Sequence, residues 1–110
     1  MGVNHHHYAY RTEWIAEDDA YVGTCVEFPS LSWVADSDTE AYAGIRDLVA
    51  EVVADLVAAG EVVPAPLSVR DYSGRFVVRV SKSLHRSLTI AAAEEGVSLN
   101  QLAVQRLARA

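Results

Sequence analysis

The sequence predicts an α+β protein, in which a small β-sheet covered by one helix is followed by a single strand and two helices. The first half alternates apolar and polar residues at strand spacing, and a long apolar stripe at helical spacing follows. The second half has one short alternating segment and then two segments that begin with serine and have helical spacing. A length of 110 residues suits one ordinary domain or two very small ones.

Three strands are expected first. Residues 21–28, rich in β-branched and aromatic residues, pair as a hairpin with residues 8–16 across the polar turn Glu17-Asp18-Asp19. Pro29-Ser30 ends the second strand, and residues 31–35 form a short third strand. Alternation in the first strand puts five residues on one face: Tyr8, Tyr10, Thr12, Trp14 and Ala16.

A long helix follows the strands. Ser37 with Glu40 three residues later has the pattern of a capping box, and Gly60 stands where a C′ glycine would end the helix. The stripe between them must lie on the sheet, and it consists of Ala41, Ile45, Leu48, Val49, Val52, Val53, Leu56 and Val57. Residues 67–72 can add a strand, so the expected sheet has three or four strands.

The charge is divided between the two halves. Residues 1–66 carry two basic and twelve acidic side chains, a net charge of −10, whereas residues 67–110 carry seven basic and three acidic ones, a net charge of +4. The division falls at the proline-marked segment 60–66, so we predict one domain over residues 1–66 and a second over residues 67–110. The basic half suits phosphate and the acidic half suits a basic protein, although an acidic surface can also serve only solubility.

The strand at residues 75–80 has no partner within the second half. Unpaired backbone groups are costly and a lone hairpin is marginal, so its simplest partner is the same strand of a second copy. The outward face of this shared ribbon holds Arg75, Val77 and Arg79, and its arginines can read the major groove of DNA. The alternative is a solvated edge strand. The expected dimer core consists of Phe76, Val78, Val80, Leu84 and Leu88.

Two capped helices complete the second half. Ser81 is the expected N-cap of the first helix, whose buried stripe continues through Ala91 and Ala92 and which ends at Gly96. Ser98 caps the second helix, with Gln101 at the capping-box position. This helix continues through Leu99, Leu102, Ala103, Arg106 and Leu107.

These residues carry a resemblance to known families. Residues 75–81, Leu84, Leu88 and the corner Glu94-Glu95-Gly96-Val97-Ser98-Leu99-Asn100 resemble the ribbon-helix-helix fold of Arc-type repressors. The first half resembles the HicB antitoxin domain, a partial ribonuclease-H-like sheet whose helix begins with an Asp-Thr-x-Glu-Ala-like entry, here Asp38-Thr39-Glu40-Ala41. The order of the two units is the one seen in HicB antitoxins of the ribbon-helix-helix type.

The resemblance implies an antitoxin of a type II HicA/HicB system. Such antitoxins silence a small basic HicA-like ribonuclease toxin and repress their own operon, so the implied partners are this toxin, operator DNA and a second copy, with further pairing to a tetramer as an option. Arg75, Val77 and Arg79 would occupy the three base-reading positions, where Val77 offers apolar contact only. Phosphate contacts are expected from Lys82, Ser98, Leu99 and Asn100. The sequence identifies no toxin-binding residues.

Two other functions stay open at this stage. One is a stand-alone ribbon-helix-helix transcriptional regulator, whose first domain binds a small ligand in a pocket lined by Trp14 and Trp33. The other is an enzyme with an unrecognised site. The aromatic residues can form a partner-binding surface or, at strand spacing, belong to the core; they are Trp14, Trp33, Tyr21 and Phe28.

No catalytic residue, metal site or cofactor is expected. Glu17, Asp18 and Asp19 fit a solvated turn better than a metal-assisted hydrolytic site, and His85 has no nucleophile nearby in sequence. The run 5–7 of three histidines fits a flexible tail better than a metal site, and Cys25 fits a small buried hydrophobe. The polar N-terminus and the lack of a long apolar run predict no membrane segment and a cytoplasmic location.

Overall fold

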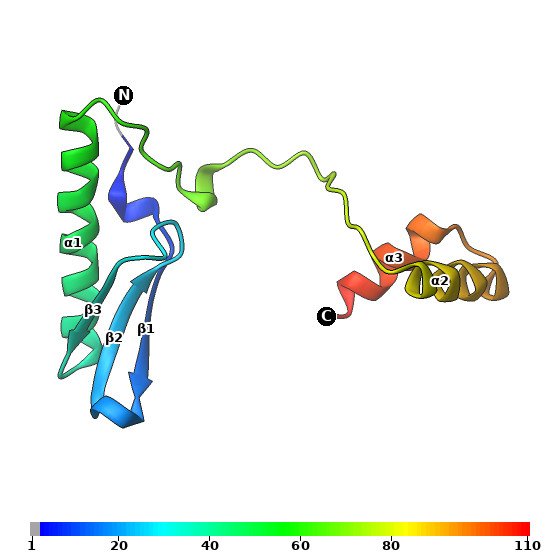
Figure 1. Cartoon of the computed structure of the whole chain (residues 1–110), viewed down its shortest axis with the longest axis horizontal. Coiled ribbons are helices and arrows are strands. Elements are labelled where there is room, and N and C mark those ends of the chain that lie inside the picture. The colour runs from blue at the N-terminus through cyan, green and yellow to red at the C-terminus, as the bar shows by residue number, and fades with distance from the viewer. Residues whose placement is uncertain (1–2) are drawn as a thin grey trace. The chain divides into compact units, whose positions relative to one another are not determined.

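The computed structural model describes residues 3–110 and contains two compact units, Met1–Tyr72 and Ser73–Ala110 (Figure 1). The first unit holds a three-stranded sheet and one long helix, and the second unit holds two helices. The α+β class predicted from the sequence is therefore confirmed. Residues 67–72 stay with the first unit: the Leu67 amide donates to the Glu27 carboxylate at 2.9 Å, and the Ser68 hydroxyl donates to the His7 carbonyl at 2.7 Å.

The sheet is antiparallel, with the strand order β1-β2-β3. Its strands are β1 (Tyr10–Ile15), β2 (Ala20–Cys25) and β3 (Ser32–Ala35). The register places Trp14 opposite Tyr21, and Gly23 opposite Trp33. A short 3-10 turn, η2 (Ala16–Asp18), joins β1 to β2. The predicted hairpin and third strand are therefore present, with shorter limits.

Two strand predictions are wrong, namely the end of the second strand and the presence of a fourth. The second strand ends at Cys25, because the Phe28 amide turns back to the Cys25 carbonyl at 3.1 Å, and Phe28 is buried in the loop that follows. The predicted fourth strand is instead a 3-10 helix, η3 (Leu67–Val69). Pro64 and Pro66 have no amide to donate to a sheet, and the Leu67 amide is used by the Glu27 carboxylate.

The covering helix, α1 (Asp38–Ala58), begins at the predicted N-cap Ser37 and ends at the predicted glycine, but the Glu40 carboxylate binds the Ser37 hydroxyl, so the capping box is not complete. The Glu40 amide donates to the Ser37 hydroxyl oxygen at 3.1 Å, and the Ser37 hydroxyl donates to the Glu40 carboxylate at 3.0 Å. Gly60 has a φ of 70°, and the Glu61 amide donates back to the Leu56 carbonyl at 2.9 Å. The fully buried part of the stripe is Ala41, Ile45, Val49 and Val53.

Part of the predicted stripe lies at the margin of the core. Leu48, Val52 and Leu56 pack partly buried against it, whereas Val57 is 60% exposed. The prediction that Val57 is buried is therefore wrong. This residue lies in the last turn of α1, where the helix extends past the end of the sheet (Figure 1).

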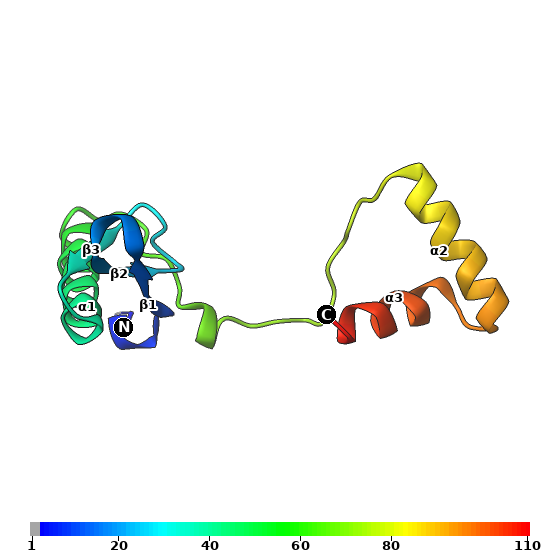
Figure 2. The same cartoon turned by 90° about the horizontal axis from the view of Figure 1, so that it is seen from below.

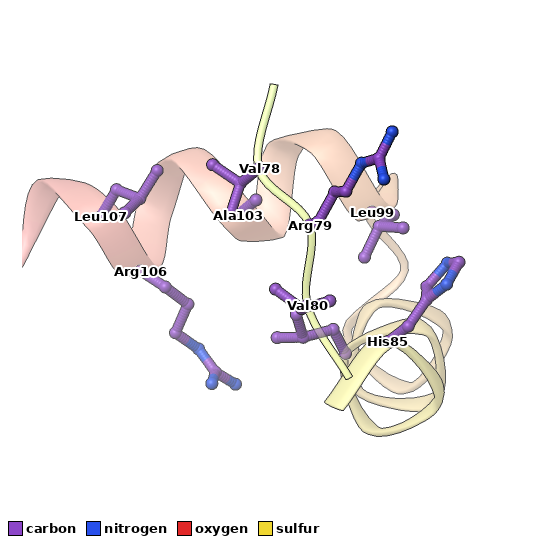
Figure 3. Close-up of a pocket in the computed structure, with 9 residues that line it drawn as sticks. Val78, Arg79, Val80, His85, Leu99, Ala103, Arg106 and Leu107 are labelled. Atoms are coloured by element: carbon purple, nitrogen blue, oxygen red, sulfur yellow. The ribbon is translucent and has the colours of Figure 1, made fainter. Parts of the chain in front are cut away.

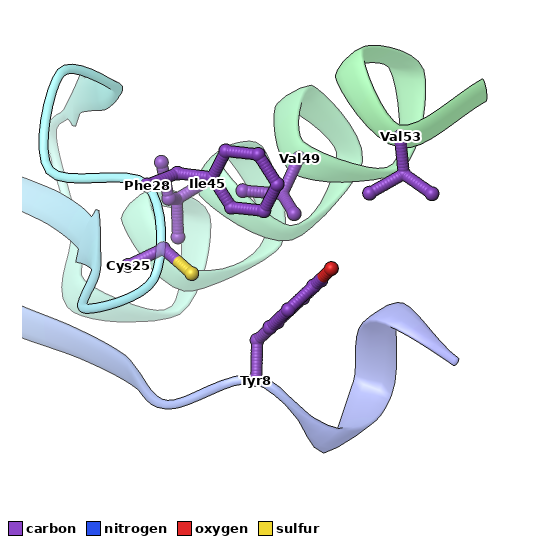
Figure 4. Packing of buried hydrophobic residues seen from close by; sticks show 6 residues of the cluster. All are labelled: Tyr8, Cys25, Phe28, Ile45, Val49 and Val53. Atoms are coloured by element: carbon purple, nitrogen blue, oxygen red, sulfur yellow. The ribbon is translucent and has the colours of Figure 1, made fainter. Parts of the chain in front are cut away.

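The core of the first unit lies between α1 and the inner face of the sheet. Figure 4 shows the cluster of Tyr8, Cys25, Phe28, Ile45, Val49 and Val53. The Tyr8 and Phe28 rings meet edge to face at 5.2 Å, and the Tyr8 hydroxyl donates to the Pro64 carbonyl at 2.6 Å. Gly23 lets α1 approach β2 closely, because a Cβ there would meet the Ala41 carbonyl and the Ile45 side chain.

The N-terminal histidines are ordered against α1, and the expectation of a flexible tail is wrong. They form a 3-10 helix, η1 (His5–His7), whose N-cap Asn4 accepts the His6 amide at 2.9 Å. The Arg46 guanidinium donates to the His6 ring and lies over the Tyr42 ring at 5.2 Å. Among residues 3–110, no group of His, Cys, Asp and Glu side chains has the arrangement of a metal site.

The second unit contains the two predicted helices, α2 (Lys82–Glu95) and α3 (Leu99–Ala108), which meet at a corner in Figure 2. The Ser81 hydroxyl oxygen accepts the Leu84 amide at 3.2 Å, and Gly96 ends α2 with a φ of 70°. Residues 75–80 form no hydrogen-bonded strand within this single chain. The predicted pairing between two copies is therefore still a prediction.

Candidate functional site

The second unit places every predicted base-reading residue at its surface. Arg75, Val77 and Arg79 are exposed, and Val77 is 91% exposed. Gly74, with a φ of 82°, turns the chain into this segment, and the Arg75 amide donates to the Ser73 hydroxyl oxygen at 3.1 Å. The segment therefore offers two guanidinium groups to a ligand.

The predicted dimer core is open in the single chain. Phe76 is 75% exposed, Val78 is 62% exposed, and Val80 and Leu84 are each 46% exposed. The buried hydrophobic side chains of this unit are Ala92 and Leu102. Most of the apolar side chains predicted for the dimer core thus lack cover within one copy.

Several of these residues line one concave apolar surface. Its volume is about 610 Å³, and it lies between residues 78–80, α2 and α3 (Figure 3). Val78, Val80 and Leu88 from the predicted dimer core are brought together here, whereas Phe76 and Leu84 are not part of the lining. The guanidinium of Arg79 extends away from Val80 (Figure 3). The remaining lining residues are Arg79, His85, Leu99, Ala103, Arg106 and Leu107.

The start of α3 has the geometry expected of a phosphate site. Ser98 and Gln101 form a complete capping box: the Ser98 amide donates to the Gln101 side chain at 2.9 Å, and the Gln101 amide donates to the Ser98 hydroxyl oxygen at 3.0 Å. The next amides, of Leu99 and Asn100, are the first of the helix and have no acceptor within it. They leave two donors at the positive end of the α3 dipole.

Basic side chains also gather at the start of α2. Lys82 and Arg86, one helical turn apart, line a shallow depression of about 340 Å³ together with His85, Thr89 and Ile90. Of these two residues, only Lys82 is among the phosphate contacts predicted from the sequence. Their i, i+4 spacing is a signal that could have found the pair.

The electrostatics of the second unit favour an anionic ligand. It has six basic and two acidic side chains, a net charge of +4. One ion pair is present in this unit, between Arg106 and Glu95 at 3.9 Å, and both side chains are half-exposed. Arg75, Arg79, Lys82 and Arg86 have no carboxylate within ion-pair distance among residues 3–110. Four cations are therefore available for phosphate or base contacts.

The first unit presents a different surface. Phe28 belongs to the core, as the alternative interpretation of the aromatic residues expected, whereas Trp14 and Trp33 are 49% and 45% exposed. Glu17 and Asp18 are exposed in the β1–β2 turn.

The strongest polar cluster of the first unit surrounds Glu27 and is structural. Its carboxylate accepts the amides of Ala9 at 3.0 Å and Leu67 at 2.9 Å, and the Cys25 thiol at 3.6 Å. Burial acts to raise the pKa of Glu27, but these hydrogen bonds outweigh it and lower the pKa. Burial also raises the pKa of the Cys25 thiol, which disfavours the reactive thiolate form.

Comparison with known proteins gives one family. The profile of the HicB family matches residues 63–107, which include α2, nearly all of α3 and the segment before them. The sheet and α1, to which the sequence analysis assigned the resemblance to the HicB domain, lie outside the matched range. No curated protein and no solved structure gives a significant match. None of the helices within residues 3–110 combines the length and apolar character needed to cross a membrane.

Proposed function

We propose that this chain is the antitoxin of a type II HicA/HicB toxin–antitoxin system. It neutralises a small HicA-like ribonuclease toxin by binding it, and it represses its own operon through a ribbon-helix-helix domain. The observation that carries this proposal is the match of the HicB family to residues 63–107, the part of the chain that carries the exposed arginines and the uncovered apolar side chains.

The second unit supplies the DNA-binding function. Two copies form a homodimer by pairing through residues 75–80. This pairing covers the exposed side chains of Phe76, Val78 and Val80, and it leaves Arg75 and Arg79 on the outer face of the ribbon. Arginine pairs bidentately with O6 and N7 of guanine, a contact typically worth about 1–3 kcal/mol of discrimination, and Val77 can contact a thymine methyl group.

Phosphate contacts orient this dimer on the duplex. The amides of Leu99 and Asn100 bind one phosphate at the start of α3, and Lys82 and Arg86 add charge at the start of α2. Adjacent half-sites can recruit a second dimer, which gives a tetramer on the operator. Because such contacts release counterions, operator binding weakens steeply as the salt concentration rises.

The first unit supplies the toxin-binding function. Residues 1–66 carry a net charge of −10, which repels nucleic acid and suits a basic protein. Repression and toxin neutralisation thus use surfaces of opposite charge. This division supports two macromolecular partners of different charge. We also propose that the protein is not an enzyme and acts in the cytoplasm.

Co-expression with the neighbouring gene tests the proposal. We expect co-purification with a short basic protein, rescue of cell growth from its toxicity, and a gel shift on the promoter of the operon. If no partner co-purifies and no growth is rescued while promoter binding is retained, the chain is a stand-alone ribbon-helix-helix regulator. If the promoter is not bound, the groove assignment is wrong.

A further inference from the structure

Three aromatic side chains share the helix-facing side of the sheet at the end nearest the β1–β2 turn. The register places Trp14 opposite Tyr21, and Trp33 opposite Gly23, two residues along β2 from Tyr21. Paired residues and residues two apart in a strand lie on the same face. We call Trp14, Tyr21 and Trp33 the aromatic face.

The aromatic face is incompletely covered because α1 begins beside it. The helix packs on β2 at Gly23, where Ala41 and Ile45 lie, and Tyr21 is nearer to the turn. Trp14 and Trp33 are therefore 49% and 45% exposed, although they point to the same side of the sheet as the core. Large half-exposed indoles that share one face are typical of binding surfaces.

The side chains of the aromatic face are held in place. The Trp14 and Tyr21 rings pack edge to face with centroids 5.1 Å apart. The Trp33 indole lies directly against Gly44 of α1, where an added Cβ would overlap it. A partner that docks here restricts little further side-chain motion, which lowers the entropic cost of binding.

Carboxylates surround the aromatic face on two sides. Figure 1 shows that the β1–β2 turn and the start of α1 lie at the same end of the unit. The exposed acidic residues of these two segments are Glu17, Asp18, Asp19, Asp36, Asp38 and Glu40. Within residues 3–110 none of the six has an ion-pair partner. Arg46, a cation of α1, is instead engaged by His6 and Tyr42.

We infer that the aromatic face is the toxin-docking surface, and that it receives arginine or lysine side chains of a small basic protein. A guanidinium group stacks on an indole and pairs with a neighbouring carboxylate, so this surface offers both halves of the contact. Nucleic acid is disfavoured by the six carboxylates, and the same face of a second copy would bring twelve carboxylates together. The inference rests on the proposed antitoxin function.

Binding of the short basic protein encoded beside this chain's gene tests the inference, with the full-length chain throughout. Trp14→Ala is expected to weaken the complex about 30-fold or more, because an aromatic anchor at the centre of an interface contributes most of its energy. The double variant Asp18→Asn with Asp19→Asn is expected to associate with the toxin about tenfold more slowly than the parent at low salt. At high salt its association rate should be close to that of the parent. Asparagine tolerates the positive φ of 48° at Asp19.

A matched control removes the same charge elsewhere. Glu51→Gln with Asp55→Asn alters two exposed carboxylates of α1 about 20–25 Å along the helix from its start, and should leave toxin binding unchanged. Intrinsic fluorescence gives a second readout, because both tryptophans of the chain belong to the aromatic face. With a tryptophan-free toxin variant, emission should shift to shorter wavelength on binding.

The outcomes separate two failures. If the parent chain binds no such protein, the proposed antitoxin function itself is overturned. If the parent binds and both the Trp14 and the Asp18/Asp19 variants bind equally well, the toxin docks elsewhere and only the surface assignment fails. Should Trp14→Ala disturb folding, as judged by circular dichroism, the exposed Asp18/Asp19 variant decides the matter alone.

Discussion

Replacement of Phe76 by alanine is expected to weaken the dimer without unfolding the single chain. Phe76 is 75% exposed in one copy, and a phenylalanine covers about 200 Å² when fully buried, so roughly 150 Å² is left for a partner to cover. At about 25 cal/mol per Å² this area corresponds to about 4 kcal/mol per chain. Alanine keeps a small part of it, which leaves a loss of about 3 kcal/mol per chain.

Two copies of the variant meet in each dimer, so the expected loss is about 6 kcal/mol, or a dissociation constant raised about 10⁴-fold. Sedimentation equilibrium over a wide concentration range measures this change directly. Val77→Ala is the matched control, because Val77 lies on the other side of the alternating segment and is 91% exposed. An unchanged dimer in Phe76→Ala, or an equal loss in Val77→Ala, would refute the pairing through residues 75–80.

Three further predictions concern single side chains. Arg79→Ala should weaken operator binding by about 1–3 kcal/mol per contacted guanine while the dimer persists, and equal gel shifts at matched salt would contradict it. The pKa of Glu27 is lowered in the folded chain, so its carboxylate stabilises the fold above the pKa of the unfolded chain, and this contribution is lost as pH falls through the folded pKa. In the Glu27→Gln variant the urea midpoint should therefore fall less on acidification than it does in the parent chain. If the midpoints of the two chains fall in parallel, the charge of Glu27 does not contribute to the acid sensitivity. Gly44→Ala should cost about 1–3 kcal/mol of unfolding free energy and alter Trp33 fluorescence, since the methyl group overlaps the indole.

Helix ends could be predicted because they depend on neighbouring residues. Ser37 with Glu40, and Ser98 with Gln101, satisfy helix amides within one turn, and the structure contains both caps where the sequence indicates them. The absence of a fourth strand could not be predicted, since it depends on a distant residue. The predicted strand at residues 67–72 is absent because the carboxylate of Glu27, forty positions earlier, takes the Leu67 amide.

The candidate site divides in the same way. Arg75 and Arg79 are exposed as alternation predicts, but Phe76, Val78 and Val80 are exposed as well, so the two faces of this segment can differ only once a second copy covers one of them. The half-exposed state of Trp14 and Trp33 could not be read from alternation, because both share the face that α1 covers. Their exposure depends on where α1 lies on β2, and that position is decided by the close contact at Gly23.

The two units should respond differently to dilution, because they differ in how much of their core one copy contains. The first unit buries a continuous cluster that includes Tyr8, Phe28 and Ile45, whereas the second buries Ala92 and Leu102 and leaves its other large apolar side chains at least partly exposed. Unfolding of a unit that needs a second copy depends on protein concentration by mass action. The unfolding of each unit can be followed separately by the NMR signal of one backbone amide in it. We expect the melting temperature of α2 and α3 to fall on dilution, and the melting temperature of the sheet and α1 to stay constant. If neither melting temperature changes with protein concentration, the second unit is stable alone. If both fall on dilution, part of the dimer contact lies in the first unit.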